Sequence, residues 1–125
     1  MKSIAATKKY IRETYFNKYI RLRDAVNEYI TCVTCRKRVH WKEANAGHFQ
    51  HGLDFVEDNQ HGQCVTCNKW KSGKLDEYTV FMIDRYGRER VDEIMRLAKN
   101  RPKYSRSELK EIKEKYKEKL KTLIP

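Results

Sequence analysis

Two cysteine pairs with the same spacing constrain the fold of this chain more than any other feature. Cys32-x-x-Cys35 and Cys64-x-x-Cys67 are separated by 28 residues in a chain of 125 residues. Thiolates are soft ligands, and two pairs of this kind supply the four sulfurs of a closed tetrahedral zinc site. The spacing therefore predicts structural zinc, with redox-active thiols or a metal-free cysteine cluster as the alternatives.

The expected zinc ion would have a mechanical role. Four cysteine ligands leave no open position for water, so the ion is not expected to take part in catalysis. It would instead tie Cys32 and Cys35 to Cys64 and Cys67, and so fix both ends of a segment that is too short and too polar to fold alone. Any catalytic metal site must then come from other residue types.

The charge of the chain indicates the class of its partner. It carries 28 Lys and Arg against 17 Asp and Glu, a formal net charge of +11, and a pI of about 9.6 favours a nucleic-acid-binding protein. A basic protein that is merely soluble is the alternative. No apolar run is long enough for a membrane span, and the N-terminus lacks the apolar core of a signal peptide. We therefore expect a cytoplasmic protein, in which paired cysteines favour metal binding over disulfides.

Hydrophobic periodicity predicts a mainly helical chain. An apolar and aromatic stripe at steps of three and four residues predicts a long helix over residues 3–30, with a basic opposite face. Similar stripes predict helices over residues 75–86 and 91–98. Ser105 and Glu108 form a capping-box pattern that begins a last helix. This last helix is expected to pack against the first helix or to form a dimer contact.

Short strands are expected in the middle of the chain. Residues 37–45 should include a strand or turn, residues 46–50 should begin a strand, and residues 55–57 should form its return strand. A helix is then expected over residues 64–72, where Gly73 can end it.

The segment between the cysteine pairs also contains residues suited to phosphodiester hydrolysis, which needs an activated water and neutralisation of the phosphate charge. His48, on the expected strand, belongs to the residue type that accepts protons near neutral pH and can serve as general base. Asn68 offers an amide oxygen that suits Mg²⁺ or Mn²⁺. Asn59 can hold the intervening loop through hydrogen bonds from its side chain to the backbone. Taken singly, however, each residue is more often a surface or turn residue.

Taken together, these residues carry a family resemblance. The order His48, Asn59, Asn68, enclosed by the two cysteine pairs, resembles the HNH or ββα-metal nuclease motif. The chain also resembles the NinG/Rap recombination proteins of lambdoid phages over about residues 28–121, and this likeness rests on Ala46-Gly47-His48-Phe49, Asn59-x-His61-x-Gln63-Cys64-x-x-Cys67-Asn68, Lys71-Ser72-Gly73 and Tyr78.

The resemblance implies an endodeoxyribonuclease that acts on branched recombination intermediates such as Holliday junctions and D-loops, in the cytoplasm of a bacterial host. It assigns His48 to activation of the attacking water, Asn68 to the catalytic Mg²⁺ or Mn²⁺, and Asn59 to support of the loop. It also implies a place for His61 near the phosphate or the metal.

One position departs from the wider HNH pattern. Many HNH enzymes carry an Asp directly before the base as a second metal ligand, whereas this chain has Gly47. His51, Asp54 or His61 could replace that ligand. Four residues around this region are expected to bind DNA, with a solvated surface as the alternative for the lysines: His51, Lys69, Lys71 and Lys74.

The expected fold is α+β and mainly helical. We expect one domain, with an N-terminal helix over residues 1–30, a zinc-clamped HNH-like ββα core over residues 31–73, and C-terminal helices over residues 74–125. A homodimer would suit the two-fold symmetry of a four-way junction. The alternatives to a nuclease are a non-catalytic zinc-knuckle module that binds DNA and a zinc-stapled adaptor that binds a partner protein.

Overall fold

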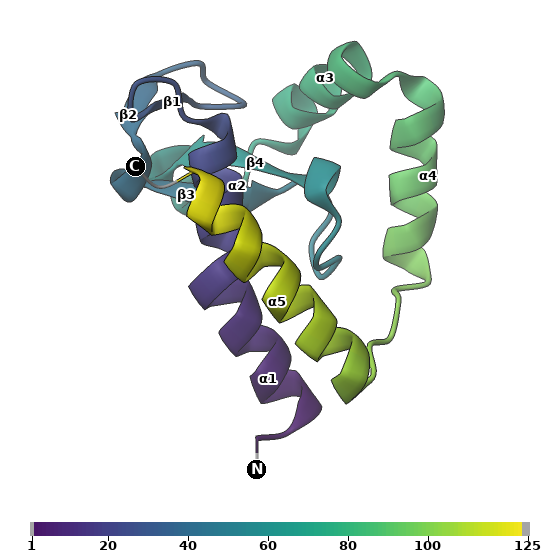
Figure 1. Cartoon of the computed structure of the whole chain (residues 1–125). Coiled ribbons are helices and arrows are strands. Elements are labelled where there is room, and N and C mark those ends of the chain that lie inside the picture. The colour runs from purple at the N-terminus through teal and green to yellow at the C-terminus, as the bar shows by residue number, and fades with distance from the viewer. Residues whose placement is uncertain (1, 124–125) are drawn as a thin grey trace.

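The computed structural model describes residues 2–123 and contains both helices and strands (Figure 1). Its N-terminal helical segment runs without a break through α1 (Ile4–Ile11), a π-helical turn (Arg12–Phe16) and α2 (Asn17–Asp24). Ser3 begins this segment, because its hydroxyl accepts a hydrogen bond from the backbone N–H of Ala6 at 3.0 Å.

The predicted helix over residues 3–30 is too long. Asn27 and Glu28 have φ values of 52° and 71°, so the chain turns back shortly after α2. Tyr29 continues the helical spacing of the apolar stripe but lies on a strand, β1 (Tyr29–Thr31). Ile30 is fully buried on this strand. The helical spacing of Tyr29 therefore does not correspond to a helix at this position.

Strand β1 pairs with β2 (Arg38–His40) in an antiparallel hairpin in which Ile30 faces Val39. A 3-10 turn (Trp41–Glu43) follows β2. The strand or turn expected over residues 37–45 is therefore confirmed.

A second antiparallel pair joins β3 (Ala44–His48) to β4 (Gln60–Cys64), and it brings His48 opposite Gln60. The strand expected over residues 46–50 thus begins earlier. Its predicted return strand over residues 55–57 is wrong.

The long loop between β3 and β4 explains that error. Phe55 has a φ of 63° and packs edge-on against Phe16, with 5.5 Å between the ring centroids. Residues Glu57–Asn59 then form a 3-10 turn. The contact with Phe16 holds the loop against the N-terminal helix, and the chain returns to the sheet only at Gln60.

The helix expected over residues 64–72 is shorter than predicted. Cys64 still belongs to β4, and one π-helical turn (Thr66–Trp70) follows it. Ser72, Gly73 and Lys74 all have positive φ, which ends the turn.

The three C-terminal helices agree with the sequence. They are α3 (Leu75–Tyr86), α4 (Arg88–Lys99) and α5 (Arg106–Leu123). The capping box is confirmed, because Ser105 and Glu108 exchange hydrogen bonds between side chain and backbone at 3.0 and 3.1 Å.

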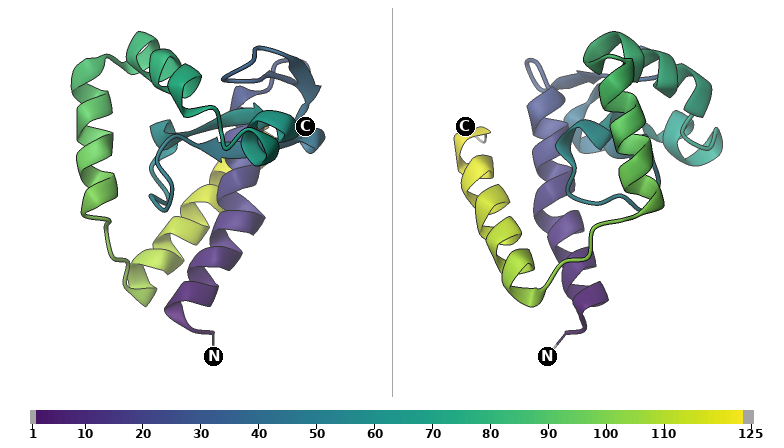
Figure 2. Two further views of the ribbon diagram at one scale, coloured as in Figure 1. Left: turned by 180° about the vertical axis from the view of Figure 1, so that it is seen from behind. Right: turned by 90° about the vertical axis from the view of Figure 1, so that its right-hand side faces the viewer.

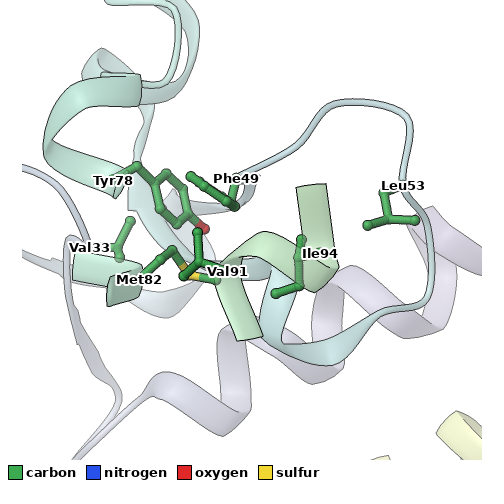
Figure 3. Packing of buried hydrophobic residues seen from close by; sticks show 7 residues of the cluster. All are labelled: Val33, Phe49, Leu53, Tyr78, Met82, Val91 and Ile94. Atoms are coloured by element: carbon green, nitrogen blue, oxygen red, sulfur yellow. The ribbon is translucent and has the colours of Figure 1, made fainter. Parts of the chain in front are cut away.

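Two apolar clusters hold the elements together. The larger one joins the loop after β3 to α3 and α4, and Figure 3 shows its buried members: Val33, Phe49, Leu53, Tyr78, Met82, Val91 and Ile94. The smaller one joins Phe16 and Ile20 of the N-terminal helix to Tyr116 of α5. Its presence confirms that the last helix packs against the first.

The two clusters place helices on different sides of the β3–β4 pair. Helices α1, α2 and α5 lie side by side, and α3 and α4 form a separate arm (Figures 1 and 2). Successive side chains of a strand point to opposite faces, so each strand contributes to both sides. Among residues 2–123, no helix has the length and apolar character needed to cross a membrane.

Candidate functional site

The two cysteine pairs meet in space. The four sulfur atoms of Cys32, Cys35, Cys64 and Cys67 all lie within 4.8 Å of one another. Cys32 follows β1, whereas Cys64 ends β4, so the cluster connects the two strand pairs. Three of these cysteines are buried and Cys35 is exposed.

The surroundings of these thiols favour a bound cation. Burial opposes ionisation of Cys32, but hydrogen bonds from the backbone N–H of Cys64 and from the hydroxyl of Thr34 outweigh it and lower the pKa of Cys32 to about 6. Burial and the adjacent thiols raise the pKa of Cys64 to about 12. Four thiolates this close would repel one another, whereas a divalent ion among them favours their ionisation. The donor set therefore fits structural zinc.

His48 lies at the end of β3, where a buried carboxylate approaches it. Its Nε2 is 3.6 Å from Oδ1 of Asp54, which is longer than a hydrogen bond. Only 7% of the Asp54 side chain is exposed. Two cations from the N-terminal helix neutralise this carboxylate, since Arg12 and Lys8 lie 3.2 and 3.4 Å from Oδ2.

This arrangement keeps Asp54 ionised. Burial alone would raise the pKa of the Asp54 carboxyl, but the adjacent His48 and the charges of Arg12 and Lys8 outweigh it and lower the pKa. Arg12 begins the π-helical turn of the N-terminal helix. Such insertions in helices often occur at functional sites.

A cavity of about 360 Å³ opens beside His48. His51 belongs to its wall, and its ring is nearly parallel to that of His48, with 6.3 Å between centroids. Lys99 and Arg101, from the end of α4 and the segment after it, bring positive charge to the same cavity. Phe49, Leu75 and Met95 supply apolar parts of the wall.

Asn59 holds the loop that carries His51. Its side-chain amide donates hydrogen bonds to the carbonyls of Gln50 and Leu53 at 3.0 Å and accepts one from the backbone N–H of Gln50 at 2.9 Å. Asn59 is fully buried. It is therefore a residue that positions the loop, and its side chain is fully engaged in that task.

His61 lies apart from His48. It faces Gly47 across the strand pair and so occupies the face opposite to that of His48. Its Nε2 is 2.6 Å from the hydroxyl of Tyr86, and Tyr78 lies on its other side. Burial lowers the pKa of His61 to about 4, which keeps the ring neutral at physiological pH. The structure does not bring His61 to the cavity.

Asn68 lies on the turn after β4, next to Cys67, and is partly buried. It is not among the residues that line the cavity beside His48. Lys69 and Lys71 are exposed and Lys74 is partly exposed. Between the first two lysines stands Trp70, whose side chain is 80% exposed.

Gly47 is required by the packing of the strand pair. A Cβ atom at this position would collide with the side-chain oxygen of Gln63 on β4 and lie 3.0 Å from its Cδ. Gln63 is fully buried, and its amide nitrogen donates to the hydroxyl of Thr34 and the carbonyl of Gly73. An aspartate at position 47 therefore has no room unless Gln63 moves.

Several residues of the site were not singled out by the sequence. Lys8 and Arg12 are four residues apart and so share one face of the N-terminal helix, a spacing that was visible in the sequence. The sequence suggested Asp54 as a metal ligand, whereas the structure pairs it with these two cations and with His48. No local pattern marks Lys99 and Arg101, because they reach the cavity only through the path of α4.

Comparisons with known proteins support the NinG part of the resemblance noted above. A family model described as Bacteriophage Lambda NinG protein matches residues 2–124. Proteins named ninG from Escherichia phage 933W and Escherichia phage lambda are each 42% identical to the chain over 112 residues, which is 86% of this chain and 53% and 52% of those proteins. The protein of that name from Salmonella phage P22 is 41% identical over the same share of the chain and 53% of its own length.

The chain spans about half the length of these curated relatives. No solved structure matches it. The match of the family model to nearly the whole chain and the identity to the phage proteins lead to one conclusion: the chain belongs to the NinG family of bacteriophage proteins.

Proposed function

We propose that this chain is a metal-dependent endodeoxyribonuclease of the HNH type that acts on branched recombination intermediates such as Holliday junctions and D-loops. One observation carries the proposal: His48 ends β3 beside the buried carboxylate of Asp54, in a strand pair whose opposite end, at Cys64, belongs to the cysteine cluster. A helical turn bearing Asn68 follows the second strand directly, which is the order of elements in a ββα-metal site.

Asp54 orients the base in this proposal. Oδ2 is neutralised by Arg12 and Lys8, so Oδ1 is the oxygen that faces His48. A movement of the ring that closes the present 3.6 Å would let Oδ1 accept a hydrogen bond from the N–H at Nε2. Nδ1 is then the nitrogen that takes a proton from water. The water oxygen forms a bond to phosphorus, the bond from phosphorus to the 3′ oxygen breaks, and that oxygen takes a proton from solvent.

Positive charge around the cavity supports the binding of phosphate. Lys99 and Arg101 line the cavity with His51, and the exposed Lys69 and Lys71 follow β4. Such residues bind phosphates with little preference for base sequence, and their binding weakens as salt increases.

Asn68 would hold the catalytic ion. Its amide oxygen is a hard ligand that suits Mg²⁺ or Mn²⁺, and the bound ion would stabilise the negative charge that develops on the phosphate. With Gly47 in place of an acidic ligand, phosphate oxygens and waters would complete the shell. We therefore expect the ion to bind weakly until DNA is present.

A non-catalytic zinc-knuckle module that binds DNA is the second candidate function. It is favoured by the absence of Asn68 from the wall of the cavity. It is also favoured by the packing of Gln63 against Gly47, which leaves no room for an acidic side chain at position 47. Such a module would bind the same DNA and leave it intact.

Cleavage assays separate the two functions. The purified protein is incubated with a four-way junction and with a linear duplex, with and without Mg²⁺ or Mn²⁺. The nuclease proposal predicts cleavage of the junction only when an ion is present. His48→Ala should abolish cleavage and leave junction binding intact.

His40→Ala is the matched control, because His40 lies on β2, accepts a hydrogen bond from Lys42 and does not line the cavity beside His48. This variant should cleave at the wild-type rate. Intact DNA under every condition, with binding retained, would establish the second candidate function instead.

A further inference from the structure

A second cavity lies at the outer edge of β4, on the side away from β3. Its volume is about 420 Å³, and residues from the end of α2, the β1–β2 hairpin, β4 and α3 line it. Four arginines belong to its wall, against one carboxylate: Arg23, Arg36, Arg38, Arg85 and Asp24. We call it the arginine groove. It shares no lining residue with the cavity beside His48.

The carboxylate in the groove is already engaged. Asp24 accepts hydrogen bonds from the backbone N–H of Gly62 at 2.8 Å and from Arg23 at 2.8 Å. Arg23 also donates to the carbonyls of Glu57 and Gln60. These two residues therefore tie α2 to β4, and the charges of the remaining arginines are not cancelled by Asp24.

The other three arginines are exposed and line the groove from different elements. Arg36 lies over the ring of Phe81 at 6.0 Å, Arg38 over Tyr29 at 5.3 Å, and Arg85 over Tyr86 at 5.9 Å. Across residues 2–123, none of the three forms an ion pair with a carboxylate. Stacking on an aromatic ring restricts each guanidinium and leaves its N–H groups available to an anion.

The backbone at Arg36 adds an independent observation. Its φ is 69°, in the left-handed region that residues with a Cβ rarely adopt and that glycine adopts freely. An arginine at this turn after Cys35 is therefore less favourable for folding than glycine would be. The long cationic side chain of Arg36 nevertheless lines the groove.

We propose that the arginine groove binds the phosphodiester backbone of a DNA arm, at a place separate from the cavity beside His48. Guanidinium groups match phosphate through pairs of parallel hydrogen bonds, and three such groups with no carboxylate partner suit a polyanion. Two separate DNA-binding places on one chain suit a branched molecule with more than one arm. The proposal rests on the DNA-binding part of the proposed function and not on its catalytic part.

Binding measurements in a His48→Ala background test the groove without cleavage. Fluorescence anisotropy with a labelled four-way junction compares the parent with the triple variant Arg36→Gln, Arg38→Gln and Arg85→Gln over a range of salt. The triple variant should bind about tenfold more weakly near 0.1 M salt. The slope of log affinity against log salt should become shallower by about 2–3, since each lost phosphate contact contributes about 0.9.

The matched control removes the same charge elsewhere, with Lys103→Gln, Lys110→Gln and Lys117→Gln at three exposed positions outside both cavities. It should bind within about twofold of the parent. Equal weakening by both triple variants, or no weakening by the groove variant, would overturn the proposal. If the groove variant does not fold, Arg85→Gln alone should weaken binding about threefold, and wild-type affinity would overturn the proposal.

The outcomes also distinguish this proposal from the proposed function. If the His48→Ala parent binds the junction and the groove variant binds it more weakly, the groove proposal is supported. This holds even if the wild-type protein cleaves no DNA. A His48→Ala parent that binds no DNA would overturn the groove together with the DNA-binding part of the proposed function.

Discussion

At the scale of single residues, the pair of His48 and Asp54 is the centre of the proposed site. The sequence predicted His48 as the base and also drew attention to Asp54, but it could not show that they meet. The same carboxylate also contacts Arg12 and Lys8, which come from a helix some forty residues earlier in the chain. Local patterns contain no information about such a contact.

Because Asp54 is ionised in the folded protein, the stability lost when its charge is removed should depend on pH. Its pKa is lowered in the folded protein, so its contribution to stability is present at neutral pH and is lost as pH falls from about 4 through the folded value. We expect Asp54→Asn to lower the free energy of unfolding by about 1.5–3 kcal/mol at pH 7. The loss should shrink as the pH falls below about 4.

Urea unfolding at several pH values measures this difference. Asp92→Asn is the control, because Asp92 is 50% exposed and its pair with Arg88 lies on the surface of α4. That substitution should change stability by less than about 0.5 kcal/mol. A loss for Asp54→Asn that stays constant down to pH 2 would contradict the role assigned to its charge.

Trp70 is the most exposed large hydrophobic residue within residues 2–123, with 80% of its surface accessible. If the proposed function holds, we expect its ring, between Lys69 and Lys71, to stack on an unpaired base at a branch point. Trp70→Ala should then weaken junction binding by about 1–3 kcal/mol, and Trp70→Phe should retain most of the affinity. Anisotropy measures both.

Fluorescence provides the matching control for Trp70. A Trp41→Phe variant leaves Trp70 as the single tryptophan of the chain, and its emission should be quenched when the junction binds. Unchanged emission together with full binding by Trp70→Ala would refute the stacking.

At the scale of elements, the sequence predicted helices better than strands. Helix α3 agrees with the periodic pattern over residues 75–86, and Gly87 ends it as expected. Strand β4 was missed because its buried residues are polar: Gln60, His61 and Gln63 have no alternating apolar pattern. Their partners, such as Asn17, come from other elements, so no local signal marks the strand.

The cysteine clamp is the element for which the sequence was most informative. We expect Cys35→Ser to lose zinc and to unfold the region between residues 29 and 70. Structural zinc contributes about 10–16 kcal/mol, as much as the whole stability of a small domain. Atomic absorption spectroscopy measures the zinc content, and amide hydrogen exchange measures the unfolding. Lys37→Ser, an exposed neighbour on the same turn, should leave both unchanged.

A well-folded Cys35→Ser protein without metal would contradict the clamp. Amide hydrogen exchange of the wild-type chain with a chelator should show the same unfolding as Cys35→Ser. Both treatments remove the ion from the same site.

The close approach of β3 and β4 at Gly47 makes a further prediction. Gly47→Asp should lower the melting temperature, because the new side chain collides with Gln63 and such overpacking costs about 1–3 kcal/mol. Gln63→Ala supplies the missing space, so the double variant should recover part of the loss. Thermal unfolding of the two single variants and the double variant measures this coupling. Additive losses would show that the two residues do not compete for space.

At the scale of the whole molecule, charge and shape support one functional interpretation. A net charge of +11 favours a polyanionic partner, and the described chain offers two separate cavities with basic walls. The sequence predicted this class of partner from composition alone. It could not predict the two cavities, because Arg85 and Arg101 reach them only when α3 and α4 are packed.

The homodimer expected from the sequence is a property of the whole molecule. A two-fold symmetric junction suits two copies of the chain, and light scattering of the protein alone and with a junction gives the number of copies directly.

We propose that His48 activates the water that cleaves DNA. The most direct test of this proposal is single-turnover cleavage of a labelled four-way junction in Mg²⁺ or Mn²⁺, measured for the wild-type chain and His48→Ala at saturating protein. We predict that the rate falls by at least about a hundredfold in His48→Ala, the typical contribution of a general base, while the affinity for the junction is unchanged. Equal cleavage rates for the two proteins would contradict the assignment of His48.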